Sequence, residues 1–102
     1  MRETVVVAFS TQEENVVPVT RALKKLAAQA KAMPGCISYV ATTVADDPTM
    51  FNVRYKWETD ADRRSYMNSD AMLAFLDSVV GMLNDLTVAK QAPLQTPRES
   101  CL

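Results

Sequence analysis

The chain has 102 residues, of which 48% are hydrophobic and 23% are charged, and its formal net charge is -1. This length predicts one domain, and this composition predicts a folded domain rather than a disordered chain. The scattered lysines and arginines argue against a nucleic-acid partner. No apolar run approaches the roughly 18 residues of a membrane span. We therefore expect a cytoplasmic protein that binds neither nucleic acid nor membrane.

The sequence contains no histidine and only two cysteines, Cys36 and Cys101. Without histidine, the chain cannot use His-ligated haem, a His-containing zinc site, or Ser-His or Cys-His catalysis. The two cysteines have no metal-site spacing, so we expect no metal. A disulfide between them is the less favoured alternative, because cytosolic proteins rarely contain disulfides.

The first half of the chain predicts a strand followed by a helix. The β-branched run from Thr4 to Phe9 is apolar on both faces, which is typical of a central strand. Asn15 is the preferred helix N-cap, because it places Pro18 in the first turn, where proline is tolerated. The alternative, a capping box that starts at Thr11, would put Pro18 inside the helix at a cost of about 3 kcal/mol.

This helix has one apolar stripe with helical spacing, and Pro34-Gly35 ends it. The stripe consists of Val19, Leu23, Leu26, Ala30 and Met33.

Two strands and a turn are predicted next. Cys36 to Ala45 is rich in β-branched residues, Asp46-Asp47-Pro48 is a turn, and Met50 to Trp57 is a strand. In the last strand aromatic and apolar residues alternate with polar ones, so one of its faces meets a core. The other face carries Asn52 and Arg54, for which we weigh binding of a carboxylate or phenolate against a role in a dimer interface.

The second half predicts two helices and a last strand. Thr59 and Ser69 are the predicted N-caps. The second of these helices carries an apolar stripe, and the final strand runs from Leu86 to Ala92. The stripe consists of Met72, Phe75, Leu76, Val79 and Leu83. We divide the chain into a domain, residues 1–92, and a C-terminal tail, residues 93–102.

The order strand, helix, strand, strand, helix, strand predicts an α+β fold of the ferredoxin-like, split βαβ type (βαββαβ). Its four strands form an antiparallel sheet with the helices on one face. The other face of so small a domain needs a cover, and a second copy is the simplest one.

Several segments in this order resemble the antibiotic biosynthesis monooxygenase family of the dimeric α/β barrel superfamily. They are Met33-Pro34-Gly35-Cys36-Ile37-Ser38-Tyr39, Asp46-Asp47-Pro48 before Phe51, Trp57-Glu58-Thr59-Asp60, and Asn68-Ser69-Asp70 with Phe75. The resemblance covers roughly Thr4 to Ala92 and rests on order and spacing rather than on any single motif.

The resemblance implies a homodimer with facing sheets and a pocket between sheet and helices in each subunit. It also implies a monooxygenase, an oxidoreductase that needs no cofactor, acting on a phenolic, quinol or polycyclic aromatic small molecule. Many members carry a histidine near the position of Tyr66, and another histidine position falls near Asp70. Haem-degrading relatives need an Asn on the first strand and a His near Leu76. This sequence has neither, so we expect no haem degradation here.

Three residues are the catalytic candidates. Trp57 would stack on a planar substrate, or it is a core aromatic. Tyr66 would donate a hydrogen bond, or accept a proton if its pKa were lowered from about 10, or it is a buried ring with a satisfied hydroxyl. Asn68 would orient a carbonyl, or it makes local backbone bonds at a helix junction. The predicted substrate pocket consists of Tyr39, Phe51, Tyr55, Met67, Met72 and Phe75.

Two alternatives to the enzyme stay open at this point. The first is a non-catalytic dimeric domain that binds a small apolar ligand or stabilises an assembly, which the missing histidine favours. The second is an RNA-binding domain of the same topology, with Phe51, Tyr55 and Trp57 stacking on bases. We disfavour it, because the net charge has the wrong sign.

Overall fold

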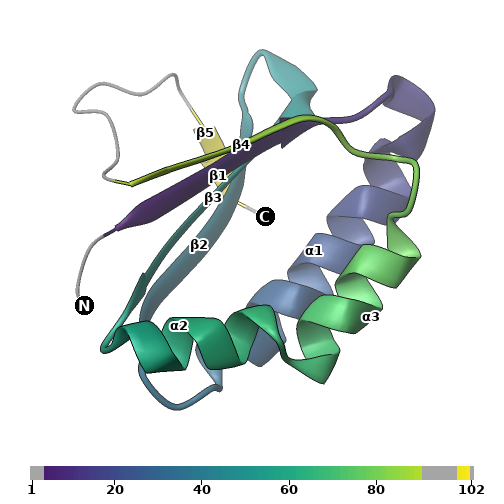
Figure 1. Ribbon diagram of the computed structural model, residues 1–102. Coiled ribbons are helices and arrows are strands. Elements are labelled where there is room, and N and C mark those ends of the chain that lie inside the picture. The colour runs from purple at the N-terminus through teal and green to yellow at the C-terminus, as the bar shows by residue number, and fades with distance from the viewer. Residues whose placement is uncertain (1–3, 91–98, 102) are drawn as a thin grey trace.

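The computed structural model describes residues 4–90 and 99–101. Its elements are β1 (Val5–Ser10), the 3-10 helix η1 (Glu13–Asn15), α1 (Val16–Lys31), β2 (Cys36–Val44), β3 (Asp47–Trp57), α2 (Asp60–Met67), α3 (Asp70–Ser78), β4 (Asn84–Lys90) and β5 (Glu99–Cys101). The strands form one antiparallel sheet in the order β4-β1-β3-β2-β5. All three α-helices lie on one face of this sheet (Figure 1). The predicted ferredoxin-like fold is confirmed, and the sheet does not close into a barrel within one chain.

The short strand β5 adds a fifth strand to the four that were predicted. It lies at the edge of the sheet against β2, where Cys101 is opposite Thr42. Most of the predicted tail lies outside the described residues, but these three residues belong to the sheet. Cys36 lies six positions before Thr42 on β2, about 20 Å away at the usual rise per residue. This separation is too long for a disulfide, and Cys36 is a free thiol.

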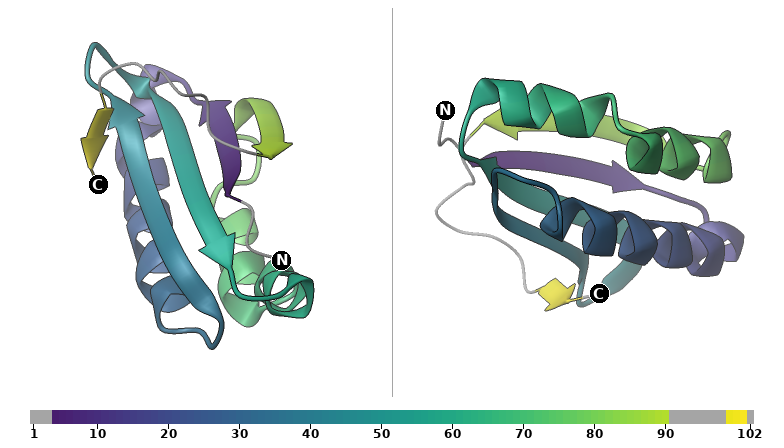
Figure 2. Two further views of the ribbon diagram at one scale, coloured as in Figure 1. Left: turned by 90° about the vertical axis from the view of Figure 1, so that its left-hand side faces the viewer. Right: turned by 90° about the horizontal axis from the view of Figure 1, so that it is seen from below.

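Strand β3 shows why the sheet has two different faces. Its residues Phe51, Val53, Tyr55 and Trp57 are all buried, whereas the residues between them are half-exposed. We call the side toward the helices the helix face and the other side the open face. Figure 2 shows that all α-helices of the described residues lie on the helix face, and that none of them crosses the open face. The strand therefore builds the core with every second residue, as its alternating pattern predicts.

Helix α1 begins after Asn15, as preferred, so Pro18 lies in its first turn. The Asn15 side chain makes no capping hydrogen bond, because η1 leads directly into the helix. Four of the five predicted stripe residues are buried against the helix face. The fifth, Met33, lies beyond the end of the helix and is partly buried.

Several predicted boundaries were wrong. The hairpin turn consists of Ala45-Asp46, so Asp47 and Pro48 already belong to β3. Helix α3 ends at Ser78 instead of continuing to Leu83. Gly81 follows with a positive φ of 76°, which helps the chain to turn toward β4.

Both predicted caps on the two short helices are confirmed. The Thr59 hydroxyl accepts a hydrogen bond from the Asp62 backbone N–H at 3.1 Å. The Ser69 hydroxyl accepts one from the Met72 backbone N–H at 3.2 Å, and it donates one to the Tyr66 carbonyl at 2.7 Å. Ser69 thereby ties the end of α2 to the start of α3. Such caps contribute about 1 kcal/mol each.

Gly35 fixes the position of α2 relative to the turn before β2. It has a φ of 83°, and a Cβ at this position would overlap the Asp62 carboxylate. Its carbonyl accepts a hydrogen bond from the Glu58 backbone N–H at 2.7 Å. Only glycine lets these two segments approach so closely.

Candidate functional site

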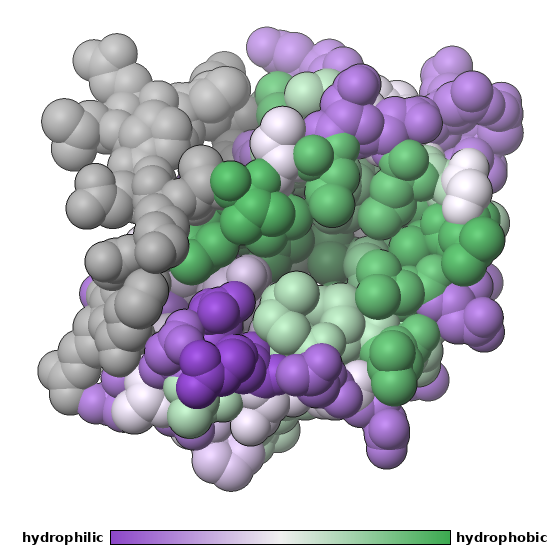
Figure 3. Space-filling model, in the orientation of Figure 1, coloured by the Kyte–Doolittle hydropathy of each residue, from purple (hydrophilic) through white to green (hydrophobic). Residues whose placement is uncertain are grey.

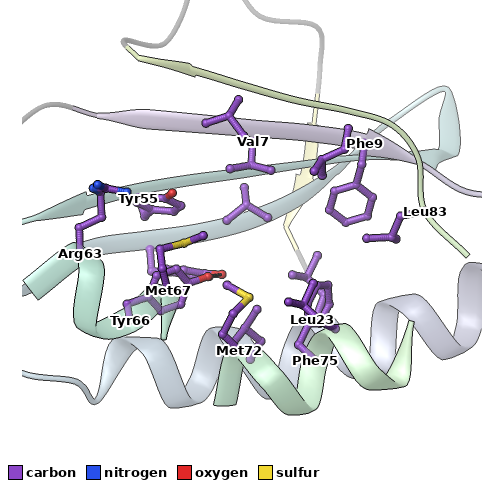
Figure 4. A pocket seen from close by; sticks show the side chains of 16 residues that line it. Val7, Phe9, Leu23, Tyr55, Arg63, Tyr66, Met67, Met72, Phe75 and Leu83 are labelled. Atoms are coloured by element: carbon purple, nitrogen blue, oxygen red, sulfur yellow. Dashed lines mark hydrogen bonds between the residues drawn. The ribbon is translucent and has the colours of Figure 1, made fainter. Parts of the chain in front are cut away.

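A cavity of about 230 Å³ lies between the helix face of the sheet and the helices (Figure 4). Its lining comes from β1 to β4 and from all three α-helices. The lining residues are Val7, Phe9, Leu23, Leu26, Tyr39, Val53, Tyr55, Arg63, Tyr66, Met67, Met72, Phe75, Leu76, Leu83, Leu86 and Val88. Apart from the tyrosine hydroxyls and Arg63, all of these side chains are apolar. The arrangement is typical of a small-molecule site with few polar groups.

The cavity opens to the surface between β4 and the helices α2 and α3. Leu86 and Val88 on β4 are 57% and 63% exposed, and Met67 and Leu76 on the helices are also exposed. We call these four residues the mouth. Figure 3 shows a hollow in this region with hydrophobic residues around it. Leu76, predicted for the core, is 48% exposed because it lies at the mouth.

The inner end of the cavity is lined by the three tyrosines of the chain, which pack with its only tryptophan into one cluster of aromatic rings. Tyr66 on α2 is at its centre. It stacks on Trp57 at a centroid distance of 5.0 Å and meets Tyr55 edge-on at 5.6 Å. Its contact with Tyr39 is also edge-on, at 5.7 Å. Such pairs add about 0.5–1.5 kcal/mol each beyond their burial.

The hydroxyl groups of Tyr39 and Tyr66 are hydrogen-bonded to each other at 2.8 Å, and either can be the donor. Burial raises the pKa of Tyr39 to about 12. Burial raises the pKa of Tyr66 as well, and the neighbouring Tyr39 raises it further. Both phenols therefore stay neutral at physiological pH. A lowered pKa for Tyr66, which a role as base would need, is the opposite of what is found.

Arg63 on α2 lies at another side of the lining, next to the sheet. Its Nε is 3.1 Å from Oδ1 of Asp60, an ion pair within the same helix. This hydrogen bond from Arg63 is the main reason why the pKa of Asp60 is lowered. Burial raises the pKa of Tyr55, and the positive charge of Arg63 opposes that rise. The charge of Arg63 therefore affects the pKa of Tyr55, which belongs to the cavity wall.

The structure separates the three catalytic candidates. Tyr66 lines the cavity. Trp57 is buried behind Tyr66 and is not among the lining residues, and its Nε1–H has no hydrogen-bond partner among the described residues. Asn68 is exposed, and its amide donates to the Arg64 carbonyl at 3.0 Å, which caps the end of α2. The alternative given for Asn68, local backbone bonding, describes its position.

Five of the six predicted pocket residues line the cavity, and Phe51 does not. Phe51 stacks on Phe9 at 5.1 Å in the core beside it. Sequence reasoning missed the contribution of β4 and, above all, Arg63. The alternation of β3 pointed to Val53, and the α1 stripe contained Leu23 and Leu26. No sequence signal distinguished Arg63 from the other charges of α2.

Two further findings concern the described residues as a whole. Within residues 4–90 and 99–101, no three His, Cys, Asp or Glu side chains gather as metal ligands would. None of the helices in that part of the chain is long and apolar enough to span a membrane.

Residues 4–78 match the family described as antibiotic biosynthesis monooxygenase. The chain belongs to this family. The matched part runs from β1 through α3, and it therefore contains every tyrosine and the arginine of the cavity. Among curated proteins, no match to the chain is found.

Solved structures share the fold at low sequence identity. A protein from Nitrosomonas europaea that carries the family's name has 19% identity and a TM-score of 0.83, with 91% of this chain and 99% of that chain covered. PA3566 from Pseudomonas aeruginosa has 20% identity and a TM-score of 0.83, with coverages of 92% and 95%. A protein from Bacteroides thetaiotaomicron that also carries the family's name has 14% identity and a TM-score of 0.84, with coverages of 92% and 90%. These likenesses concern the fold alone.

Proposed function

We propose that this protein is a cofactor-independent monooxygenase that oxidises a phenolic, quinol or polycyclic aromatic small molecule in the cavity. The observation that carries the proposal is a cavity of about 230 Å³ with aromatic walls and two buried phenol hydroxyls. Aromatic rings suit a planar ligand, and the hydroxyls provide the polar contact that orients it. Membership of the antibiotic biosynthesis monooxygenase family supports the same reaction class.

The chemistry requires little covalent help from the protein. An ionised phenol or hydroquinone gives one electron to dioxygen, and the resulting ligand radical and superoxide combine at a ring carbon. The hydroperoxide then loses water and leaves a carbonyl. One oxygen atom therefore enters the ligand, and the other leaves as water.

The side chains of the cavity contribute position and exclusion of water. The apolar walls hold the ring against the cluster around Tyr66, and they keep bulk water away from the radical pair. The Tyr39–Tyr66 pair, which stays protonated, would donate a hydrogen bond to the oxygen that becomes negative during the reaction. Trp57 supports Tyr66 from behind through the stacked contact.

We further propose that the protein works as a homodimer whose open faces meet. Val6 and Ala8 on β1 and Val40 on β2 give this face an apolar surface of small side chains. None of the three α-helices α1, α2 and α3 covers these residues (Figure 2). Because Val6 and Val40 both pair with Arg54, the apolar and polar groups of this face alternate from strand to strand.

The test is oxygen uptake by purified, metal-free protein with a panel of hydroquinones, naphthols and anthrones. We expect protein-dependent uptake with one quinone formed per dioxygen consumed. Tyr66→Phe keeps the ring but removes its hydroxyl, and we expect a loss of activity of about tenfold or more. Tyr39→Phe should have a similar effect, and Val17→Ala, an exposed change on α1, should have none. Full activity in both tyrosine variants would refute the site assignment.

A non-catalytic ligand-binding domain is the second candidate. Two observations favour it. The chain has no histidine that could act as a base, and the raised pKa of Tyr66 keeps that phenol protonated. Thermal stabilisation by the same panel without any oxygen uptake would support this candidate. Protein-dependent uptake would exclude it.

A further inference from the structure

We propose that Arg63 binds the anionic oxygen of the ligand, so that this cavity takes up an aromatic phenolate in preference to the neutral phenol. The proposal rests on the proposed function only for the aromatic ligand class. A histidine base would ionise the ligand by accepting its proton, whereas Arg63 favours the ionised ligand by binding it. The ligand loses its proton to water, and the protein keeps the anion.

Arg63 brings a positive charge to a lining that is otherwise uncharged. Among the sixteen described residues that line the cavity, Arg63 alone is charged. Figure 4 shows its side chain extending from α2 toward the sheet, on the side of the cavity where Tyr55 lies. Its side chain is 35% exposed, so the guanidinium group lies at the border between cavity and solvent. A ligand can therefore keep its apolar body inside while its charged oxygen reaches Arg63.

The guanidinium group of Arg63 is held by an ion pair within α2. Its Nε is held by Asp60 at 3.1 Å, which fixes the plane of the group. The Arg63 backbone N–H donates to the Thr59 carbonyl at 3.2 Å, but within the described residues the side chain makes no hydrogen bond besides that to Asp60, so its terminal nitrogens can donate to a ligand. A planar guanidinium with one edge held in place is well suited to an oxygen anion.

The charged groups next to Arg63 come mainly from its own helix. The other charged groups of α2 are Asp60, Asp62 and Arg64. Arg64 also pairs with Asp60, and Asp62 accepts a hydrogen bond from the Thr59 hydroxyl at 2.9 Å. Both guanidinium groups of the helix are thus placed against Asp60, whereas Asp62 is turned toward Thr59 and the chain at Gly35. Tyr55 on β3 faces Arg63 and, with a raised pKa, stays neutral. Among the described lining residues no carboxylate opposes a ligand anion.

Apart from Arg63 and the tyrosine hydroxyls, the cavity walls are apolar, and this determines how Arg63 affects the ionisation of the ligand. An apolar cavity by itself disfavours an ionised ligand and raises its pKa. A fixed positive charge has the opposite effect. If Arg63 binds the anion, the bound ligand should be more ionised than the free ligand. Without Arg63 it should be less ionised.

The test uses 4-nitro-1-naphthol, whose nitro group makes the ring too electron-poor to react readily with dioxygen and whose phenolate has its own absorption band. At a pH equal to the pKa of the free probe, we measure the phenolate-to-phenol ratio of the bound probe. We expect this ratio to exceed one in the wild type and to fall about tenfold or more in Arg63→Gln, which corresponds to about one pKa unit. Arg63→Lys keeps a positive charge and should retain part of the effect.

The matched control is Arg64→Gln. Arg64 lies on the same helix and pairs with the same Asp60, but it does not line the cavity. This variant should leave the ratio within about twofold of the wild type. An unchanged ratio in Arg63→Gln, an equal fall in Arg64→Gln, or no binding of the probe to the folded wild type would each overturn the proposal. Because no turnover is measured, a failure of the oxygen-uptake test leaves this result unaffected.

Discussion

The two faces of the sheet are made by the same strands, yet they carry different kinds of side chain. On the helix face, β3 places Phe51, Val53, Tyr55 and Trp57, and the helices cover them. On the open face the same strand places polar residues, next to small apolar residues of β1 and β2. Large rings fill a volume, and small side chains make a flat surface. Position along a strand therefore decides whether a substitution affects the core and the site or the contact with a second copy.

The largest effect on stability should come from removing a buried ring from the helix face. Phe51→Ala removes a ring that is 1% exposed and stacked on Phe9, and we expect a loss of about 3–5 kcal/mol in the free energy of unfolding. Urea denaturation measures this loss. On the open face, Val40→Ala should cost about 1 kcal/mol or less in protein diluted to the monomer, because Val40 is 40% exposed. Equal losses in the two variants would contradict the distinction between the faces.

The next effect concerns the turn that places α2 under the helix face. Gly35→Ala must adopt a positive φ and also displace the Asp62 carboxylate, and we expect a loss of about 2–3 kcal/mol. Gly81→Ala is the matched control, since its φ is also positive but no atom lies within 4 Å of the added methyl group. It should lose only about 1–2 kcal/mol. If Gly81→Ala were the more damaging change, the close approach at Gly35 would have no energetic importance.

Alkaline pH should destabilise the folded protein through the helix face, because all three tyrosines lie on its side. The unfolded chain releases phenol protons near pH 10, whereas the folded chain holds that of Tyr39 up to about 12 and that of Tyr66 higher still. The folded state thus binds more protons, and stability must fall as the pH rises above about 10. We expect urea midpoints to decrease over this range, and to decrease less steeply in the Tyr39→Phe, Tyr66→Phe double variant. A parallel decrease in the two proteins would show that other groups are responsible.

The smallest of these effects in energy should appear on the open face. Val40→Lys adds a positive charge opposite Arg54 on a face that we propose to meet its own copy. We expect the dimer dissociation constant to rise at least about tenfold, or roughly 1.4 kcal/mol, as measured by sedimentation equilibrium. Val17→Lys makes the same substitution at an exposed position on α1 and should leave the dissociation constant unchanged. A monomeric wild-type protein would refute the dimer.

Much of the fold could be predicted because its signals are local. The alternation of β3 and the hydroxyl caps Thr59 and Ser69 depend only on neighbouring residues. The end of α3 could not be predicted, because Val79 and Leu83 continue the helical spacing although the chain turns away at Gly81. β5 was missed because a three-residue strand at a sheet edge has no periodicity of its own.

The site was less predictable, since a cavity depends on distances between elements. Arg63 has the same local sequence context as Arg64, and only the approach of α2 to the sheet brings one of them to the cavity. Asn68 shows the reverse case. Its amide serves the last carbonyl groups of α2, a need that arises at any helix end, and so its polarity indicated no ligand.

The bond between Tyr39 and Tyr66 has one more property, which follows from its symmetry. Either oxygen can be donor or acceptor, so the pair has two hydrogen arrangements that differ only by rotation of the hydroxyl groups. In either arrangement, one hydrogen and at least one lone pair remain outside the shared bond. Without moving a ring, the inner end of the cavity can therefore meet both the hydroxyl group of a quinol and the carbonyl group of a quinone. The same pair of residues would accommodate the ligand before its oxidation and after it.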